Sequence, residues 1–230
     1  MLDEQAWADA INSPTKRFPE NETQGLIICG ANWGGDPKLE LSPSDDPRSY
    51  FSDARVNNYP YRNRLVTWLA LLGHPLSDSA PGPYERAIIQ TNWLSGDHYQ
   101  SKNISGNLRT LCANPEMVSD VVRRFRLLRP RLIVFASAGV FDAFTHVASE
   151  FADPLGSQTS ETETLWWTPA EPGKRRARAM LLHFEFCNVI GLPHPTGQRA
   201  VPNAAIEHFR ELIGPVIGEF RAGLPVSPCL

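Results

Sequence analysis

A short, unbroken apolar run near the start of the chain limits the possible folds most strongly. Residues 26–29 read Leu-Ile-Ile-Cys, with no polar alternation. A strand that is apolar on both sides must be covered on both sides, which is typical of a parallel sheet. Gly30 ends the run, and the Gly34-Gly35 pair keeps the next residues out of regular structure. Asn32 therefore follows the carboxyl end of a predicted strand, where open α/β sheets bind ligands. Taken alone, this stretch fits an ordinary strand-to-loop turn better than a site.

Strand-like apolar runs alternate with segments of helical spacing along the rest of the chain. The predicted strands are residues 25–30, 87–92, 132–136 and 180–190, and the predicted helices are residues 3–12, 62–72, 115–128, 139–151 and 202–220. This alternation predicts an α/β fold with a parallel sheet covered on both faces. We expect a three-layer α/β/α sandwich around a four-stranded, mainly parallel sheet. One domain would span residues 1–230, with its core at about 20–215 and a loose C-terminal tail.

Three polar segments, residues 36–60, 95–115 and 153–178, fall outside the predicted strands and helices, and residues 95–115 are interpreted as irregular. Residues 36–60 are rich in Pro, Ser, Asp and Asn and predict a long loop, which in a compact domain is usually functional. Residues 153–178 predict a hairpin with a basic tip at 174–178, which is either a solvated turn or a phosphate contact at the edge of a site. Within the predicted helix 115–128 and at its end, the arginines at 123, 124, 126 and 129 lie mostly opposite the apolar face and are interpreted as a solvated helix surface.

Composition excludes several classes of protein. Hydrophobic residues make up 42% of the 230 residues and charged residues 20%, so the chain can form a core. The formal net charge of −3 argues against binding nucleic acid across a broadly basic surface. The acidic N-terminus lacks the features of a signal peptide, and no apolar run is long enough for a membrane span. We therefore expect a cytoplasmic protein without a membrane partner.

The sequence also lacks the common signatures of metals, cofactors and nucleophiles. Its four cysteines, Cys29, Cys112, Cys187 and Cys229, are too scattered for a zinc or iron–sulfur site, so neither a metal nor another cofactor is expected. Buried thiols explain the two cysteines in apolar runs. Phosphate-binding glycine motifs and a nucleophile elbow are absent from the sequence.

A histidine between two prolines follows the last predicted strand. The segment 192–198 reads Leu-Pro-His-Pro-Thr-Gly-Gln, and the prolines hold His194 in an extended backbone. Thr196 and Gly197 can offer backbone N–H groups to a phosphate. Asn32, Asn92 and His194 thus follow three different strands, and the loops that carry them can meet in one crevice of a doubly wound sheet.

These motifs, in this order, resemble the uracil-DNA glycosylase superfamily, nearest in style to its mismatch-specific and single-strand-selective members. The first motif of that family, Gly-x-Asn-Pro-Gly, stands here as Gly-Ala-Asn-Trp-Gly at 30–34. Its last motif, His/Asn-Pro-Ser, stands here as His-Pro-Thr at 194–196. Segments 88–92, 131–136 and 62–65 resemble the strand with the base-reading Asn, the third strand and the helix after the first site loop. The resemblance covers roughly residues 20–215.

The resemblance implies a base-excision enzyme that acts on DNA containing uracil or a related lesion, as a monomer. A glycosylase must orient a water, stabilise the leaving base, read its edge and hold the flipped nucleotide. By this likeness Asn32 would position the water and His194 would donate a hydrogen bond to the base carbonyl. Asn92 would pair with the uracil edge, because its amide carries both a donor and an acceptor.

The remaining site residues follow from the same likeness, and all would contact the substrate. Gly30 and Ala31 belong to the first motif. Phe51 is the first choice for stacking on the base, and Tyr59 is the second. Thr196 and Gly197 would hold a phosphate, and Gln198 would stand near the gap that the flipped base leaves in the duplex.

Departures from the family pattern leave other functions open. Trp33 replaces a proline, and Asp36 offers a second, less favoured register for a catalytic carboxylate, because it lies far past the strand end. The main alternative is a catalytically silent member of the same fold that binds a nucleobase, a nucleotide or a protein partner. A weaker one is an unrelated α/β hydrolase with His194 as the base and Ser137 as the nucleophile.

Overall fold

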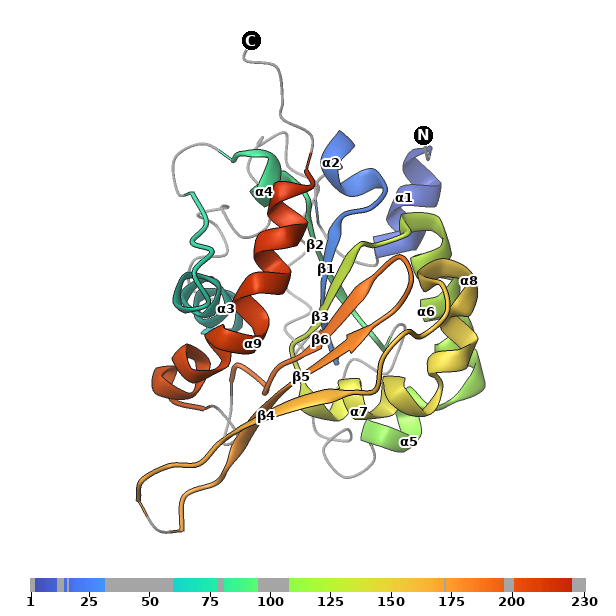
Figure 1. The fold of residues 1–230 in the computed structure, drawn as a ribbon. Helices are drawn as coiled ribbons and strands as arrows, with labels where there is room; N and C mark the ends of the chain where they lie inside the picture. Colours follow the sequence, from blue (N-terminus) through green and yellow to red (C-terminus); the bar gives the residue numbers. More distant parts are fainter. Residues whose placement is uncertain are drawn as a thin grey trace.

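The computed structural model describes residues 3–11, 15, 17–31, 60–77, 81–94, 108–171, 173–196 and 201–224, and Figure 1 shows an α/β arrangement of helices around one sheet. The strands are β1 (Leu26–Gly30), β2 (Ile88–Asn92), β3 (Leu132–Phe135), β4 (Glu163–Trp167), β5 (Ala177–His183) and β6 (Asn188–Gly191). The helices are α1 (Glu4–Ile11), α2 (Pro19–Glu22), α3 (Pro60–Leu71), α4 (Pro83–Arg86), α5 (Leu108–Cys112), α6 (Pro115–Leu128), α7 (Ala138–His146), the 3₁₀ helix η4 (Ala148–Phe151), α8 (Ala152–Leu155) and α9 (Asn203–Ala222).

The sheet has six strands in the order β2-β1-β3-β6-β5-β4, rather than the four expected. Strands β2, β1, β3 and β6 are parallel, whereas β5 is antiparallel to both β6 and β4. The prediction of one strand over 180–190 was wrong. A tight turn divides that run, and the Phe184 N–H donates to the Cys187 carbonyl at 2.9 Å. The turn residues 184–187 include neither Gly nor Pro, so the run lacked the usual signal of a reversal.

Helices cover both faces of the sheet, as the unbroken apolar runs predicted. Along β1, Ile27 and Cys29 face one core cluster, while Leu26 and Ile28 face another. The first cluster packs against α1, α6 and α7, and the second against α3 and α9 (Figure 1). Every residue of β1, β2 and β3 is buried. The carboxyl ends of the four parallel strands therefore meet at one edge of a sheet whose β1, β2 and β3 strands are covered on both faces.

Thr15, and Ile11 at the end of α1, contact the free edge of β2. The Gln90 N–H donates to the Thr15 hydroxyl at 3.1 Å, and that hydroxyl donates to the Gln90 carbonyl at 3.3 Å. The Thr91 hydroxyl donates to the Ile11 carbonyl at 2.7 Å. These contacts satisfy edge groups that would otherwise be open to pairing with another chain.

Most of the helices predicted from periodicity are confirmed. Helix α6 spans Pro115–Leu128 as expected, and the Asn114 side chain caps it by accepting from the Glu116 N–H at 2.9 Å. Gly73 follows α3 with φ +93°, the left-handed conformation that favours glycine at a helix end. The helix expected over 139–151 is instead α7 followed by η4, and a short α5 lies within the stretch interpreted as irregular.

The predicted hairpin is also confirmed. Strands β4 and β5 pair with Trp166 opposite Arg178, and the hairpin projects from the body of the molecule (Figure 1). Within the described part of the chain, no helix has the length and apolar character needed to cross a membrane.

Candidate functional site

Four residues from distant parts of the chain meet at the carboxyl edge of the parallel strands. Gly30 ends β1 and is the register partner of Asn92 at the end of β2. A Cβ atom on Gly30 would lie 2.6 Å from Asn92 Oδ1 and 3.2 Å from Tyr61 Oη, so both side chains lie against Gly30. The Tyr61 and His194 ring centroids are 6.1 Å apart, with 56° between the ring planes. We call Gly30, Tyr61, Asn92 and His194 the strand-end cluster.

A buried arginine of α6 forms a hydrogen bond with the main chain of Asn92. Asn92 is 2% exposed and Arg124 of α6 is 1% exposed. Arg124 Nη1 donates to the Asn92 carbonyl at 2.8 Å and to Thr91 Oγ1 at 2.9 Å, and Nη2 donates to the Trp93 carbonyl at 3.1 Å. The interpretation of Arg124 as part of a solvated helix surface was therefore wrong. Its guanidinium therefore holds the main chain at Asn92 and Trp93 and the side chain of Thr91 in place.

His194 is held by its own turn and is half-buried. The Thr196 N–H donates to His194 Nδ1 at 3.2 Å, and the Thr196 carbonyl lies 2.9 Å from the same nitrogen. The first contact suits an Nδ1 acceptor with the proton on Nε2, and the second suits an Nδ1 donor. In both tautomers Nδ1 is turned toward Thr196, so the other ring nitrogen, Nε2, is the one available to a ligand.

The structure brings together some of the predicted site residues, and others lie outside the described part of the chain. Gly30 and Asn92 lie together in the strand-end cluster, and His194 joins it through the ring of Tyr61; Ala31 follows Gly30, and Thr196 is hydrogen-bonded to His194. The residues outside the described ranges are Asn32, Phe51, Tyr59, Gly197 and Gln198. Ser137, the nucleophile of the hydrolase alternative, is the buried N-cap residue of α7.

Sequence reasoning missed Tyr61. It lies in the first turn of α3, directly after the long predicted loop, and Pro60 begins that helix. Proline is favoured in the first turn of a helix, so Pro60 could have placed the helix start two residues earlier than expected. Tyr61 would then have stood out as an aromatic residue close to the predicted site.

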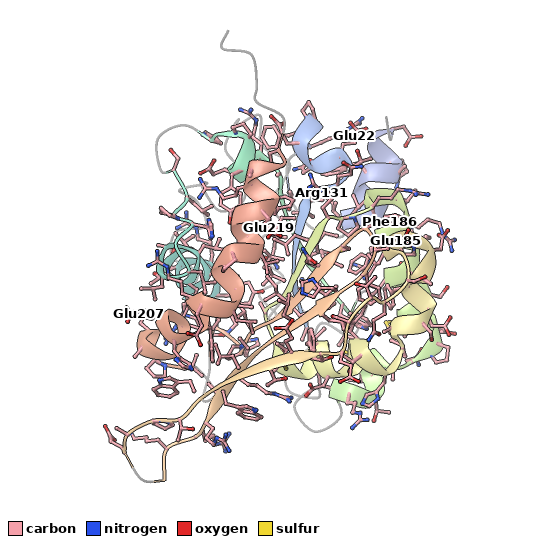
Figure 2. The ribbon with its side chains drawn as sticks, viewed as in Figure 1. Glu22, Arg131, Glu185, Phe186, Glu207 and Glu219 are labelled. Atoms are coloured by element: carbon pink, nitrogen blue, oxygen red, sulfur yellow. The ribbon has the colours of Figure 1, made fainter. Side chains whose placement is uncertain are left out.

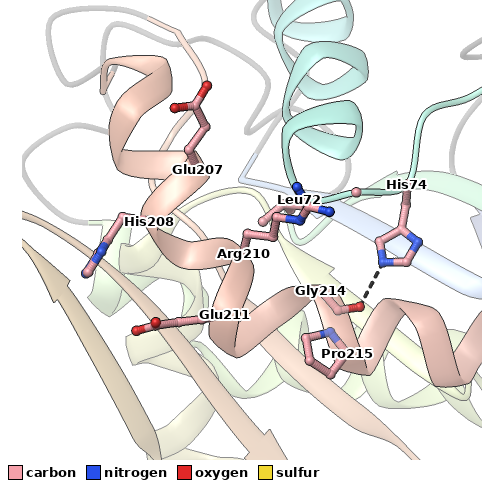
Figure 3. Close-up of a pocket in the computed structure, with 9 residues that line it drawn as sticks. Leu72, His74, Glu207, His208, Arg210, Glu211, Gly214 and Pro215 are labelled. Atoms are coloured by element: carbon pink, nitrogen blue, oxygen red, sulfur yellow. Dashed lines mark hydrogen bonds between the residues drawn. The ribbon is translucent and has the colours of Figure 1, made fainter.

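Two cavities in the described part of the chain lie away from the strand-end cluster. One, of about 630 Å³, lies between the end of α3 and α9 (Figure 3). Tyr61 lies near the start of α3 and Leu72 of this cavity follows its end, so the two are about 16 Å apart along the helix axis. His74 lines this cavity, and its Nε2 lies 2.8 Å from the Gly214 carbonyl. Burial is the main cause that lowers the pKa of His74 below 6.5.

The second cavity, of about 410 Å³, lies at the opposite edge of the sheet. Gln24, Arg131 and Asn188, which line it, stand at the amino ends of β1, β3 and β6. Figure 2 shows Arg131 and Phe186 at this end of the molecule, far from the tip of the β4–β5 hairpin. Neither cavity contains a residue of the strand-end cluster.

The described cysteines are buried thiols. Burial raises the pKa of Cys29 and of Cys112 to about 12, and it also raises the pKa of Cys187. Thiols of this kind are poor nucleophiles at neutral pH. Among the described residues, no three His, Cys, Asp or Glu side chains gather in a way that could hold a metal ion.

Comparisons of the chain with protein-family models and with curated proteins found no match. The likeness to the uracil-DNA glycosylase superfamily therefore stays a prediction based on the motifs. The geometry of the strand-end cluster is independent of that likeness.

Proposed function

We propose that this chain is a monofunctional DNA glycosylase that hydrolyses the N-glycosidic bond of uracil or a related damaged base. The proposal assigns it the three-layer α/β/α fold of the uracil-DNA glycosylase superfamily, with β2, β1, β3 and β6 as the parallel core. The cytoplasmic location and the monomeric state expected from the sequence belong to the same proposal. One observation carries it: Gly30 and Asn92 lie together at the carboxyl edge of the sheet, and Tyr61, which lies against Gly30, has its ring beside that of His194.

An amide and an imidazole at one edge suit the chemistry of base release. When the glycosidic bond breaks, negative charge develops on the leaving base, and a donor aimed at its carbonyl oxygen stabilises that charge. His194 can supply this donor from Nε2–H when Nδ1 accepts from the Thr196 N–H. Donors of this kind contribute about 3 kcal/mol to transition-state stabilisation.

The burial of Asn92 supports a role in reading the base. A uracil edge offers a donor and an acceptor side by side, and an amide presents the complementary pair. Hydrogen bonds formed away from water are stronger, and a site built to make them rejects bases that cannot. Arg124 keeps the backbone of Asn92 in place, so the amide is positioned before the base arrives. Asn32 is assigned to the attacking water by the motif alone.

The direct test is uracil release from a labelled oligonucleotide under single-turnover conditions, with single- and double-stranded substrates and several lesions. We expect release by the wild type and a loss of about 10²–10³-fold in His194→Ala, the usual effect of removing such a donor. Asn32→Ala should also lose activity. His146→Ala is the matched control, because His146 is an exposed residue at the far end of α7.

Two outcomes would contradict the proposal. If no base is released from any substrate while the protein still binds uracil-containing DNA, the chain is a silent member of the fold. If His194→Ala and His146→Ala release uracil at the wild-type rate, the imidazole of the strand-end cluster has no part in the reaction.

A further inference from the structure

The β4–β5 hairpin carries positive charge in a chain that is negative overall. We define the arm as the tip residues 168–171 and 173–176 together with Trp166 and Arg178 on the strands. Lys174, Arg175 and Arg176 are all exposed, and Glu171 is the one acidic residue of the tip. The tip therefore has a formal charge of +2, three cations against one carboxylate, while the whole chain has −3.

The outer face of the hairpin combines this charge with an exposed aromatic ring. Side chains alternate along a strand, so Trp166, Arg178 and Arg176 share one face. The opposite face, with Leu165 and Ala179, packs toward α9. Trp166 is 45% exposed, which is unusual for so large an apolar side chain.

Of the two arginines beside Trp166, one is paired with a carboxylate in the described part of the chain and the other is not. The Arg176 Cζ lies 4.6 Å from the centre of the Trp166 ring, and the Arg178 Cζ lies 5.5 Å from it. Arg178 is already paired with Asp142 of α7, at 2.6 and 2.8 Å. Arg175 and Arg176 have no acidic partner among the described residues, and Lys174 lies 3.4 Å from Glu171. A guanidinium held against an indole face keeps its N–H donors directed outward, where they can bind a phosphate.

The register of the sheet places the arm on the same side as the strand-end cluster. Met180 of β5 pairs with Gly191 of β6, and these strands are antiparallel. Residues that precede Met180 therefore extend beyond the carboxyl end of β6, where the chain continues to His194. Arg176 lies four residues before Met180, or about 13 Å along an extended strand. His208 of α9 steadies the base of the arm, with Nε2 at 3.1 Å from the Trp166 carbonyl.

We propose that the arm binds the phosphate backbone of the nucleic acid whose base enters the strand-end cluster, through Arg175 and Arg176. This inference rests on the proposed function for the identity of the polymer. The arm supplies a local basic contact, which reconciles a nucleic-acid substrate with an acidic chain. Phosphate contacts of this kind fix position and do not read sequence.

The test is the salt dependence of binding to an undamaged, labelled duplex oligonucleotide, measured by fluorescence anisotropy with the full chain. The double variant Arg175→Gln/Arg176→Gln removes two phosphate contacts. We expect weaker binding at low salt and a slope of log K against log salt that is smaller by about 1.8, since each duplex phosphate contributes about 0.9. The control Arg123→Gln/Arg126→Gln makes the same change in net charge on α6, and it should leave the slope unchanged.

Trp166 gives a second, independent test. Trp166→Ala should weaken binding in the same direction, because Arg176 loses its support, while Trp166→Phe should keep most of the wild-type affinity. Since Trp166 is partly exposed, both variants should fold, and thermal unfolding of each checks this.

The outcomes separate this inference from the proposed function. An unchanged slope in the Arg175/Arg176 variant would overturn the arm's role, even if uracil release were intact. An equal loss in the α6 control would overturn it too, because net charge alone would then explain binding. Arm-dependent binding without any base release would support the phosphate contact and contradict only the proposed glycosylase activity.

Discussion

Gly30 is the residue on which the geometry of the site depends most closely. A Cβ at this position would lie 2.6 Å from Asn92 Oδ1, well inside van der Waals contact. Gly30→Ala should displace the Asn92 amide, lower uracil release by about 10²-fold and destabilise the fold by about 1–3 kcal/mol. Single-turnover release and urea unfolding measure the two effects.

The control for this variant is Gly218→Ala in α9. A Cβ on Gly218 would make ordinary contact at 3.6 Å, and alanine is favoured within a helix. That variant should release uracil as the wild type does. Wild-type release by Gly30→Ala would show that the Asn92 amide does not need its place beside β1.

Arg124 links the interior of the protein to the same site. Its guanidinium bonds the Asn92 and Trp93 carbonyls and lies 3.2 Å from Asp120. Arg124→Met keeps the aliphatic stem and leaves these acceptors without their donor. We expect a loss of about 3–5 kcal/mol in the free energy of unfolding, the usual cost of removing one partner of a buried ionic group. The exposed neighbour Arg123→Met should change stability by less than about 0.5 kcal/mol. If the two variants lost the same amount of stability, Arg124 would not be holding the main chain at Asn92.

At the scale of elements, the junction of α3 and α9 should make stability depend on pH. Burial, together with the charges of Arg221 and Arg210, lowers the pKa of His74, although its bond with the Gly214 carbonyl opposes this. Glu207 and Glu211 also line this junction (Figure 3). The unfolded chain therefore binds a proton near pH 6.5 that the folded chain resists, so stability falls as the pH drops below about 6.5.

Urea unfolding at pH 7.5 and pH 5.5 tests this dependence. His74→Gln keeps an N–H donor for Gly214 and does not titrate, so its stability should decrease less between the two pH values than that of the wild type. A decrease of the same size in both proteins would assign the acid sensitivity to other groups.

The same scale shows which elements the sequence could predict. The runs at β1 and β3 are unbroken apolar sequences, and this pattern predicted that both faces of the strands are buried. Asn114 and Pro115 are typical residues of a helix start and stand at the start of α6. The β5–β6 turn was not predictable in this way, because Phe184–Cys187 contains neither Gly nor Pro. Periodicity also could not separate Arg124 from its exposed neighbours, because its partners are backbone carbonyls of a distant strand end.

For the site, the strand ends were predictable and the contacts between them were not. Asn92 and His194 stood out because each follows a strand, and parallel strands share an edge. The contact of Tyr61 with His194 depends on how α3 packs after a long loop, which local patterns do not encode.

At the scale of the whole molecule, an aromatic cluster joins the site to the core. Phe144 of α7 packs against Phe135, Phe151 and Phe184, with ring centroids 5.0–5.8 Å apart, and against Trp93, which follows Asn92. Phe144→Ala should lower the free energy of unfolding by about 3–5 kcal/mol. Phe186→Ala, at a 59% exposed position, should change it by less than about 0.5 kcal/mol in the same urea titration. Similar losses in both would contradict a core centred on Phe144.

The central claim is that the strand-end cluster binds one nucleobase. Titration of the ¹⁵N-labelled protein with free uracil, followed by ¹H–¹⁵N correlation spectra, tests it most directly. We predict saturable shifts at the backbone amides of Gly30 and Thr196 and at the Asn92 side-chain amide, and their loss in Asn92→Leu. Shifts confined to His74 and its neighbours in the α3–α9 cavity, or no shifts at all, would contradict the account.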